Sequence, residues 1–354
     1  MKVGLVHGSL ARIGGGEKVA IGFLEAMNNM GLVPKLFSGD EDLDGGIIKK
    51  VFGKHVDFEH VKVGTVRLRS FMGLYRNTLP RLFTTKMSGF DLVVDTSGLN
   101  IAPIIKPRRM IRYVHNPIMH RLREVERKGA FWSAYRRPYE IISRRIPENC
   151  ILLANSNFTS SRIKEEWGRD ASVLYPPVEL KTPGDKVRQV VSVGRFSFEK
   201  RYEEVVQLAK TMPAMKFIIC GALYDRAYYE KIAAQAVGRE NILLMPDVPD
   251  ADLEILLAKS RFFLHAMRNE DFGIAIVEAM SCGCIPVVHR SGGPKEIVGD
   301  DTLTFSEIKE VPSIISSIAG REDEISTTMM RKASEFSYAN FVSRAEQEMK
   351  KVLG

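Results

Sequence analysis

The sequence contains no apolar run that approaches the roughly 18 residues of a membrane-spanning helix. Its first residues, MKVGLVHGSL, resemble a strand followed by a turn, and their apolar run is too short for the core of a signal peptide. Only four cysteines are present, at positions 150, 220, 282 and 284, and their spacing fits neither a disulfide framework nor a zinc site. These absences predict a cytoplasmic protein whose cysteines are packing groups.

The chain also lacks clear motifs for nucleic acids and divalent metals. Its net charge is +8, but no nucleic-acid recognition motif accompanies this charge. Two D-x-D patterns, at 42–44 and 250–252, match the letters of a metal-binding motif. We interpret the second as a helix cap, because an apolar helical pattern follows it, and the first as part of a polar loop. The sequence therefore predicts no nucleic-acid partner and no bound metal.

The positive charge is concentrated in the first half of the chain. Residues 1–180 carry 28 Lys+Arg against 18 Asp+Glu, whereas the remainder carries 23 against 25. Between Lys106 and Arg145 there are 12 Lys+Arg and 3 Glu, interleaved with Phe131, Trp132, Tyr135 and Tyr139. This composition is typical of a surface that rests on anionic lipid headgroups. We expect the N-terminal half to bind an anionic membrane surface from the cytoplasm, with a solvated basic face as the alternative.

Short apolar segments alternate with helical patterns along the whole chain. The segments are KVGLVH, FDLVVDTS, MIRYVHNP and CILLANS in the first half, and QVVSVGR, KFIICGA, NILLMPD, RFFLHAM and IPVVHR in the second. This alternation is typical of parallel βαβ units, and 354 residues exceed one ordinary domain. We predict an α/β fold of two doubly wound, Rossmann-like domains facing across a cleft. We expect them at 1–180 and 181–354, with the last helix, about 338–354, crossing back to the first.

Two loops that follow predicted strands are candidates for a phosphate site, because ligands of such sheets bind at the carboxyl ends of the strands. GGGEKVA, at 14–20, leads into a helix whose free N–H groups suit a phosphate or a sugar hydroxyl. A flexible turn explains this segment as well. GRFSFEK places Arg195 and Lys200 beyond a strand end, where two cations can neutralise a diphosphate. A solvated basic loop is the alternative there.

The segment RNEDFGIAIVEAMSCG contains the strongest candidate for a ligand-binding site. Gly273 begins a helix, so that a ligand can approach the N–H groups of Phe272, Gly273 and Ile274. Glu278 follows one turn later and leans toward the helix N-terminus, while Glu270 lies in the preceding loop. Carboxylates pair well with the vicinal hydroxyls of a sugar. Together with the basic loop, the two glutamates predict a nucleotide-sugar site.

EDFGIAIVE resembles the E-x7-E motif of the retaining glycosyltransferases of family 4, which have the GT-B fold. GGGEKVA, YVHNP, NSNFTSSRIKEEWG, YPPV and VGRFSFEK occur in the order expected of that family. The resemblance covers nearly the whole chain. The SGGPKEIV wording is closest to the GDP-mannose-dependent mannosyltransferases that extend dolichol-linked oligosaccharides. The resemblance implies hexose transfer, with mannose from GDP-mannose favoured, to a lipid-linked or other glycan acceptor bound by the N-terminal half.

The resemblance also implies roles for four catalytic residues. Arg195 and Lys200 would bind the diphosphate of the donor, and Glu270 would hold the transferred hexose. His115 matches the histidine near the anomeric centre of the donor sugar. No protein nucleophile is evident, so departure and attack on the same face of the sugar are expected, with retention of configuration.

Further positions are implied to bind the donor. His7 and His289 also end predicted strands, but we rank both below the histidine of YVHNP because neither matches a family role. The implied donor-binding residues are Gly15, Gly16, Gly221, Val248, Phe272, Gly273, Ile274 and Glu278.

Other functions remain open at this stage. A glycosidase requires two carboxylates flanking the scissile bond, and such a pair is not identifiable. A transferase with a UDP-sugar donor and a soluble acceptor, a GT-B nucleotide-sugar epimerase and a noncatalytic donor-binding subunit are the alternatives to a mannosyltransferase.

Overall fold

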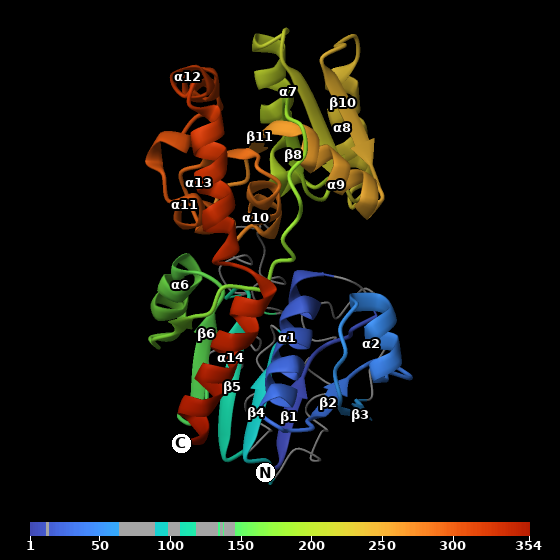
Figure 1. Ribbon diagram of the computed structural model, residues 1–354, viewed down its shortest axis with the longest axis vertical. Coiled ribbons are helices and arrows are strands. Elements are labelled where there is room, and N and C mark those ends of the chain that lie inside the picture. The colour runs from blue at the N-terminus through green and yellow to red at the C-terminus, as the bar shows by residue number, and fades with distance from the viewer. Residues whose placement is uncertain (12–13, 64–88, 98–106, 118–133, 135–136, 138–145) are drawn as a thin grey trace. The chain divides into compact units, whose positions relative to one another are not determined.

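The computed structural model describes residues 1–11, 14–63, 89–97, 107–117, 134, 137 and 146–354. The chain divides into two compact units. Unit 1 consists of Met1–Pro177 and Tyr338–Gly354, and unit 2 consists of Val178–Ser337. Helix α14 (Tyr338–Leu353) therefore belongs to the unit that begins the chain (Figure 1).

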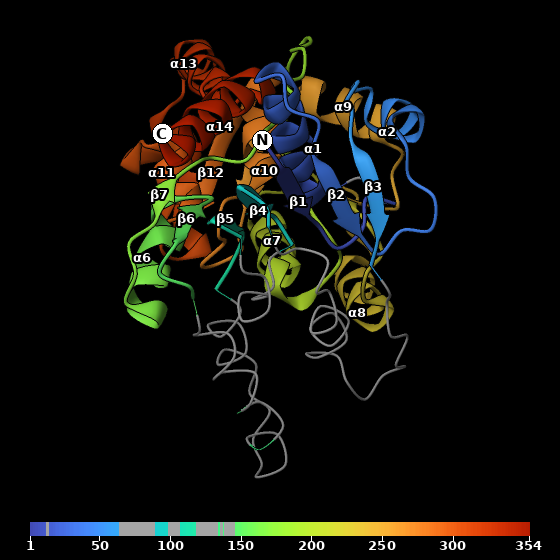
Figure 2. The ribbon, with the colours of Figure 1, turned by 90° about the horizontal axis from the view of Figure 1, so that it is seen from below.

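Unit 1 is built on a parallel sheet of seven strands in the order β3-β2-β1-β4-β5-β6-β7 (Figure 2). Its strands are β1 (Val3–Val6), β2 (Lys35–Ser38), β3 (Glu59–Lys62), β4 (Leu92–Asp95), β5 (Arg109–Val114), β6 (Cys150–Ala154) and β7 (Ser172–Val173). The central strands are buried apolar runs, which explains why they read as continuous hydrophobic segments in the sequence. Besides α14, its helices include α1 (Gly15–Asn29), α2 (Gly45–Phe52) and α6 (Asn157–Trp167).

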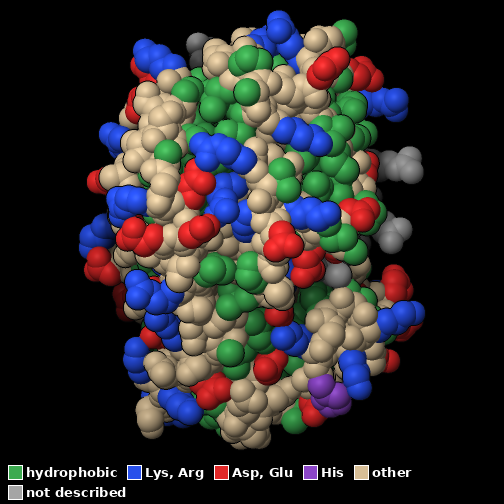
Figure 3. All heavy atoms as spheres, turned by 45° about the horizontal axis from the view of Figure 1, so that its top comes forward, with side chains coloured by type: hydrophobic (Ala, Val, Ile, Leu, Met, Phe, Trp, Pro, Cys, Tyr) green, Lys and Arg blue, Asp and Glu red, His purple; other side chains and the backbone are tan. Residues whose placement is uncertain are grey.

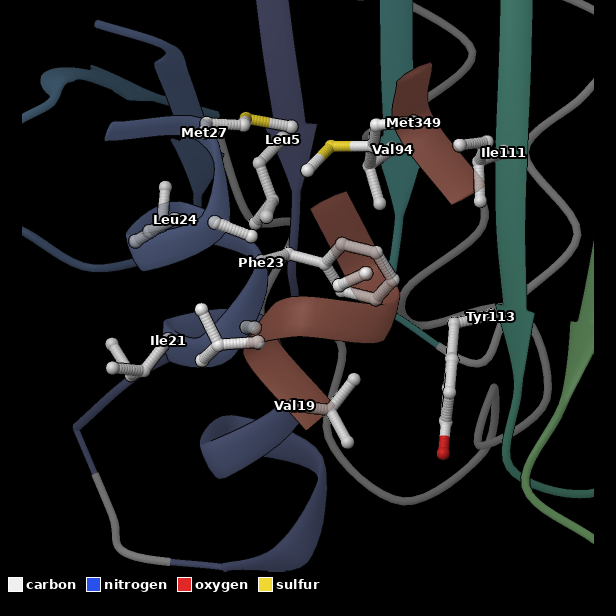
Figure 4. Close-up of a cluster of buried hydrophobic side chains, with 14 of the residues drawn as sticks. Leu5, Val19, Ile21, Phe23, Leu24, Met27, Val94, Ile111, Tyr113 and Met349 are labelled. Carbon is white, nitrogen blue, oxygen red and sulfur yellow. The ribbon is translucent and has the colours of Figure 1, made fainter. Parts of the chain in front are cut away.

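The core of unit 1 lies between the sheet and helices α1 and α14 (Figure 4). Phe23 of α1 packs edge-on against Tyr113 of β5 and Phe341 of α14. The two helices approach closely at Gly22, where a Cβ would come within 2.5 Å of the Phe341 ring. The last helix of the chain thus completes the core of the first unit.

Unit 2 has a parallel sheet of six strands in the order β10-β9-β8-β11-β12-β13. The strands are β8 (Val187–Val193), β9 (Lys216–Gly221), β10 (Ile242–Pro246), β11 (Ser260–His265), β12 (Ile285–His289) and β13 (Thr304–Phe305). Its helices are η2 (Phe198–Lys200), α7 (Tyr202–Thr211), α8 (Arg226–Ala236), α9 (Asp250–Lys259), α10 (Ile274–Ser281), α11 (Gly293–Val298), η3 (Asp301–Leu303), η4 (Ile308–Glu310), α12 (Val311–Ser317) and α13 (Glu322–Ser334).

Both sheets reverse their strand order at one point, between β1 and β4 in unit 1 and between β8 and β11 in unit 2. At such a point the two following connections leave in opposite directions and open a crevice at the carboxyl ends of the strands, where ligands of open α/β sheets bind. The fold therefore indicates that a ligand would bind near the residues that follow β1, β4, β8 and β11.

Within the described ranges, no helix is both long and apolar enough to cross a membrane. Acidic and basic side chains are interspersed over the face shown in Figure 3. The basic and aromatic segment 106–145 falls largely outside the described residues, Phe131, Trp132, Tyr135 and Tyr139 included.

Candidate functional site

A close ion pair joins the segments that follow β8 and β11, at the point where the strand order of unit 2 reverses. Lys200 ends the short helix η2, and its Nζ lies 2.6 Å from Oε2 of Glu270. The two side chains are only 15% and 14% exposed, so solvent screens their interaction weakly. Two residues proposed from separate motifs thus lie in direct contact.

His265, the last residue of β11, approaches the same carboxylate and was not predicted from the sequence. Its Nε2 lies 3.5 Å from Glu270 Oε2. Burial would raise the pKa of Glu270, but the charge of Lys200 and the proximity of His265 together hold it well below its usual range. Burial lowers the pKa of His265. Glu270 is therefore a buried carboxylate held in its ionised form.

Gly194 and Gly221 bring the ends of β8 and β9 together. A Cβ on Gly221, whose φ is +138°, would come within 2.2 Å of the Gly194 carbonyl oxygen. A Cβ on Gly194 would come within 3.0 Å of both Lys200 Cε and Tyr202 Oη. Gly194 therefore leaves room for the lysine, and Gly221 is required by its positive φ and by the close approach of the Gly194 backbone.

The backbone of the Glu270 loop rests on Ser291, Gly292 and Gly293, another contact that the sequence did not reveal. The Gly293 N–H donates to the Glu270 carbonyl at 2.9 Å, and the Asn269 N–H donates to Ser291 Oγ at 2.9 Å. A Cβ on Gly293 would come within 2.4 Å of the Asp271 carbonyl oxygen. The double glycine after β12 was the available sequence signal.

Arg195 is placed apart from the Lys200–Glu270 pair. It is half exposed, its guanidinium lies 4.8 Å from the Tyr224 ring centroid, and its Nη2 lies 3.4 Å from Glu199 Oε1. Ser197 also donates to Glu199, at 2.7 Å. An exposed pair of this kind is weak, about 1 kcal/mol or less, so an anionic ligand can replace the carboxylate.

Helix α10 begins where the sequence predicts. Gly273 precedes its first residue with φ +103°, and the half-buried Ile274 begins the helix. The Phe272 ring is buried and packs edge-on against Phe336, with centroids 5.7 Å apart. That side chain is therefore a core group, which leaves only the backbone of the residue for a ligand.

Glu278 and Val248 are both half-buried. Burial would lower the pKa of Lys181, but its bond to Glu254 and the nearby charge of Glu278 raise it. Val248 follows Asp247, whose backbone has φ +51° and whose Oδ1 accepts the Leu223 N–H at 2.8 Å. The geometry thus shows Glu278 near a lysine, and the donor-binding roles of both residues remain predictions.

A second polar cluster lies at the switch point of unit 1. His115 follows β5, and its Nε2 lies 3.2 Å from the Thr96 carbonyl oxygen, while His7 after β1 bonds the Thr96 hydroxyl at 3.0 Å. His7 Nε2 also lies 3.7 Å from Glu17 Oε1. Gly16 stands over both rings, since a Cβ there would lie 3.6 Å from His115 and 3.8 Å from His7.

The electrostatics of this cluster keep His115 neutral. Burial and the nearby His7 lower the pKa of His115 to about 4, against the hydrogen bond that His115 donates to the Thr96 carbonyl and the charge of Glu17, both of which raise it. Burial would raise the pKa of Glu17, but its contact with His7 and a backbone hydrogen bond lower it. Gly16 therefore lies close to both His115 and His7, and Glu17, which was not predicted from the sequence, contacts His7. The donor-binding role of Gly16 and the catalytic role of His115 remain predictions. Gly15 begins α1.

The two D-x-D patterns lie where the sequence places them, one in a loop and one at the start of a helix, but the second does not cap its helix. Asp250 and Asp252 lie in the first turn of α9, which is preceded by Pro249 and has no side-chain cap. Their negative charges stabilise the N-terminus of the helix, although neither side chain caps it. Residues 42–44 lie in a loop, as predicted, and their last residue, Asp44, is the N-cap of α2 and accepts the Ile47 N–H at 2.8 Å. The described part of the chain has no group of three or more His, Cys, Asp or Glu residues that could hold a metal ion.

Two parallel-sheet units of this kind define the GT-B fold, as predicted. The crystal structure of the Anabaena protein HepE in complex with UDP matches with a TM-score of 0.72 and 18% identity, covering 99% of this chain and 100% of that one. Residues 180–311 match the family described as glycosyl transferases group 1. The matched residues lie within unit 2 and include Arg195, Lys200 and Glu270.

Curated relatives agree with the resemblance stated from the motifs. The chain is 27% identical over 247 residues to a Candida glabrata protein named GDP-Man:Man(3)GlcNAc(2)-PP-Dol alpha-1,2-mannosyltransferase, covering 58% of this chain and 48% of the relative. The Homo sapiens protein of that name is 26% identical over 230 residues, covering 54% and 46%. The chain spans about half the length of these relatives.

Proposed function

We propose that this protein is a retaining hexosyltransferase that moves mannose from GDP-mannose to a lipid-linked glycan. The observation that carries the proposal is the buried Lys200–Glu270 pair, because it places a cation and an ionised carboxylate together in the crevice of a glycosyl transferases group 1 domain. The names of the curated relatives support the choice of donor and acceptor.

The roles of the residues follow from their charges. Lys200 and Arg195 stabilise the charge that develops on the departing diphosphate, with the N–H groups at the start of α10. Glu270 accepts hydrogen bonds from hydroxyls of the hexose, and Glu278 from those of the ribose. The backbone of Gly221 and Val248 lies at the ends of β9 and β10, in reach of the base.

We assign His115 and the adjacent Gly15 and Gly16 to the sugar side of the donor. A histidine that stays neutral can donate or accept a hydrogen bond near the anomeric carbon without repelling a developing positive charge on the sugar ring. The leaving diphosphate oxygen then receives the proton of the attacking acceptor hydroxyl on the same face. In this proposal the two cations provide the charge compensation, and the reaction requires no divalent metal.

We extend the proposal to location and acceptor binding. The excess of ten positive charges in residues 1–180 supports attachment to an anionic membrane surface, where a lipid-linked acceptor resides. The N-terminal unit would bind that acceptor, and the protein would be peripheral on the cytoplasmic face.

The test is transfer from a panel of labelled nucleotide sugars to a lipid-linked mannosyl glycan, with the anomeric configuration of the product read by NMR. We expect an α-linked product from GDP-mannose and none with Glu270→Gln. Preference for a UDP-sugar would overturn the assignment of GDP-mannose as donor. Preference for a soluble acceptor would overturn the assignment of a lipid-linked acceptor. Epimerised donor without acceptor, or nucleotide binding without turnover, would overturn the transferase itself.

A further inference from the structure

Two buried polar atoms beside Glu270 have no role in the function described so far. His265 is 5% exposed and Tyr202 is 3% exposed. Neither His265 Nε2 nor Tyr202 Oη makes a hydrogen bond to any residue that the structure describes. Burying a polar atom without a partner costs about 1–3 kcal/mol, so an unpaired atom at such a place requires an explanation.

The two oxygens of Glu270 have different surroundings. Oε2 lies 2.6 Å from Lys200 Nζ and 3.5 Å from His265 Nε2. Across the described ranges, neither an ion pair nor a hydrogen bond involves Oε1. One oxygen is thus directed at protein groups, and the other is available to a ligand hydroxyl.

The position of His265 is fixed by the sheet. The residue ends β11, the strand between β8 and β12, and its Cα pairs with Val288 of β12. Its ring lies parallel to Phe263, with centroids 6.4 Å apart and an interplanar angle of 11°. The strand thus fixes the backbone position from which the ring approaches Glu270.

The chemistry of the ring favours a donor at Nε2. The nearest charged groups are Lys200 and Glu270, and burial holds the ring neutral, so it carries a single proton. Because Nε2 faces an ionised carboxylate, the proton is more stable on Nε2 than on Nδ1. At 3.5 Å this contact is longer than a good hydrogen bond, and a small movement of Glu270 toward the ring would complete it.

We propose that His265 is a positioning residue for recognition of the donor hexose. Its Nε2–H holds Oε2 of Glu270 from the side opposite to solvent, while Lys200 is drawn toward the diphosphate, and Oε1 keeps its aim at a hexose hydroxyl. The inference rests on the proposed function, since it assumes that Glu270 binds the sugar of a nucleotide sugar.

The test compares His265→Gln with His265→Asn. The Gln amide nitrogen can reach the place of Nε2, whereas the Asn amide reaches only the place of Nδ1. Calorimetry on the folded variants should show GDP-mannose binding weakened about tenfold in His265→Asn, largely restored in His265→Gln, and GDP binding within about twofold in both. Combining His265→Asn with Glu270→Gln should add no further loss.

Three results would contradict the proposed role of His265. Equal weakening of GDP and GDP-mannose, no difference between Gln and Asn, or additive losses in the double variant would assign His265 to packing alone. Thermal unfolding of each variant reports whether a loss of binding is a loss of fold.

A spectroscopic measurement separates this inference from the proposed function. NMR of the ligand-free, histidine-labelled protein should show His265 as the neutral Nε2–H tautomer, with a proton shift that moves in Glu270→Gln and not in Glu278→Gln. The Nδ1–H tautomer, or no response to Glu270→Gln, would overturn the inference. If the wild type binds no nucleotide sugar, the proposed function fails, and this measurement still decides whether His265 positions Glu270.

Discussion

Gly292 lies against the backbone of Glu270 so closely that a Cβ would come within 2.4 Å of the Glu270 carbonyl oxygen and 2.9 Å of its nitrogen. Gly293 makes a similar approach to Asp271. The turn after β12 thus packs against the backbone of the loop that contains Glu270. The position of the Glu270 side chain therefore depends on two glycines, Gly292 and Gly293.

Gly292→Ala should displace this loop. Gly238→Ala is the control, because it also places an alanine at positive φ, +72° against +76° for Gly292, and a Cβ on Gly238 would meet nothing within 4 Å. Gly238→Ala should lose about 1–2 kcal/mol of unfolding free energy because of its positive φ. Gly292→Ala should lose more, because φ +76° with ψ −163° is a conformation nearly restricted to glycine and its Cβ would meet the Glu270 backbone. Only Gly292→Ala should also lose at least about tenfold in donor affinity, because a displacement near 1 Å is costly at a site. Equal effects in the two variants would count against the support role.

Arg195→Ala and Lys200→Ala should separate catalysis from stability. Removing either cation should lower the transfer rate by about 10²-fold or more, since each stabilises the leaving diphosphate. Only Lys200→Ala should also reduce the unfolding free energy, by about 3 kcal/mol, because it leaves the mostly buried Glu270 without its cation. Urea unfolding and initial rates provide the two measurements. Rates within a few-fold of wild type would remove the diphosphate assignment.

The stability of the protein should depend on pH through His115. Its pKa of about 4 lies below the usual value near 6.5 for the unfolded chain, so the unfolded state gains a proton first as pH falls. The contribution is complete above about pH 6.5 and is lost progressively as pH falls toward 4, at about 1.4 kcal/mol per unit. His115→Gln should flatten the fall in unfolding free energy between pH 7 and 5. His55→Gln, a change at an exposed histidine, should keep the wild-type slope.

Chelation should leave transfer unchanged. In the proposed reaction Arg195 and Lys200 provide the charge that a divalent cation provides elsewhere. Initial rates measured with and without EDTA should agree within error. A loss restored by Mg²⁺ or Mn²⁺ would show that a metal takes part.

Sedimentation with vesicles tests the membrane proposal. We expect binding to anionic vesicles at low salt that falls as salt screens the charges, since each basic residue contributes about 1 kcal/mol near such a surface. Changing Arg136, Arg137, Arg144 and Arg145 to Gln should weaken it. The same change at four exposed basic residues of unit 2, Lys216, Arg226, Lys231 and Arg239, should not. A wild type that stays in the supernatant would favour a soluble acceptor.

The sequence allowed the fold and half of the unit 2 site to be predicted because those features have local signals. The strands are short apolar runs, and RNEDFGIAIVE combines a loop, a glycine and a helix in one segment. Glu270 and Lys200 were assigned from separate motifs, and the structure joins them.

The residues that escaped prediction act through contacts between distant segments. In the sequence, His265 is one more member of the apolar run RFFLHAM. Its contacts involve a carboxylate in the next loop and the nearby charge of Lys200, which lies in the short helix after β8. Glu17 likewise gains its role only when β1 and β4 bring His7 and Thr96 beside it. The spacing of residues along the chain does not predict contacts between such distant segments.

Helix α14 makes unit 1 discontinuous in the chain, and this has a consequence for synthesis on the ribosome. Phe341 and Met349 of α14 are buried in the same core as Phe23, yet they are translated after the whole of unit 2. Unit 2 can therefore fold while unit 1 still exposes the apolar surface of α1 that α14 will cover. Unit 1 begins to be synthesised first, but its core is completed last. The incomplete core of unit 1 is where a molecular chaperone would bind the nascent protein.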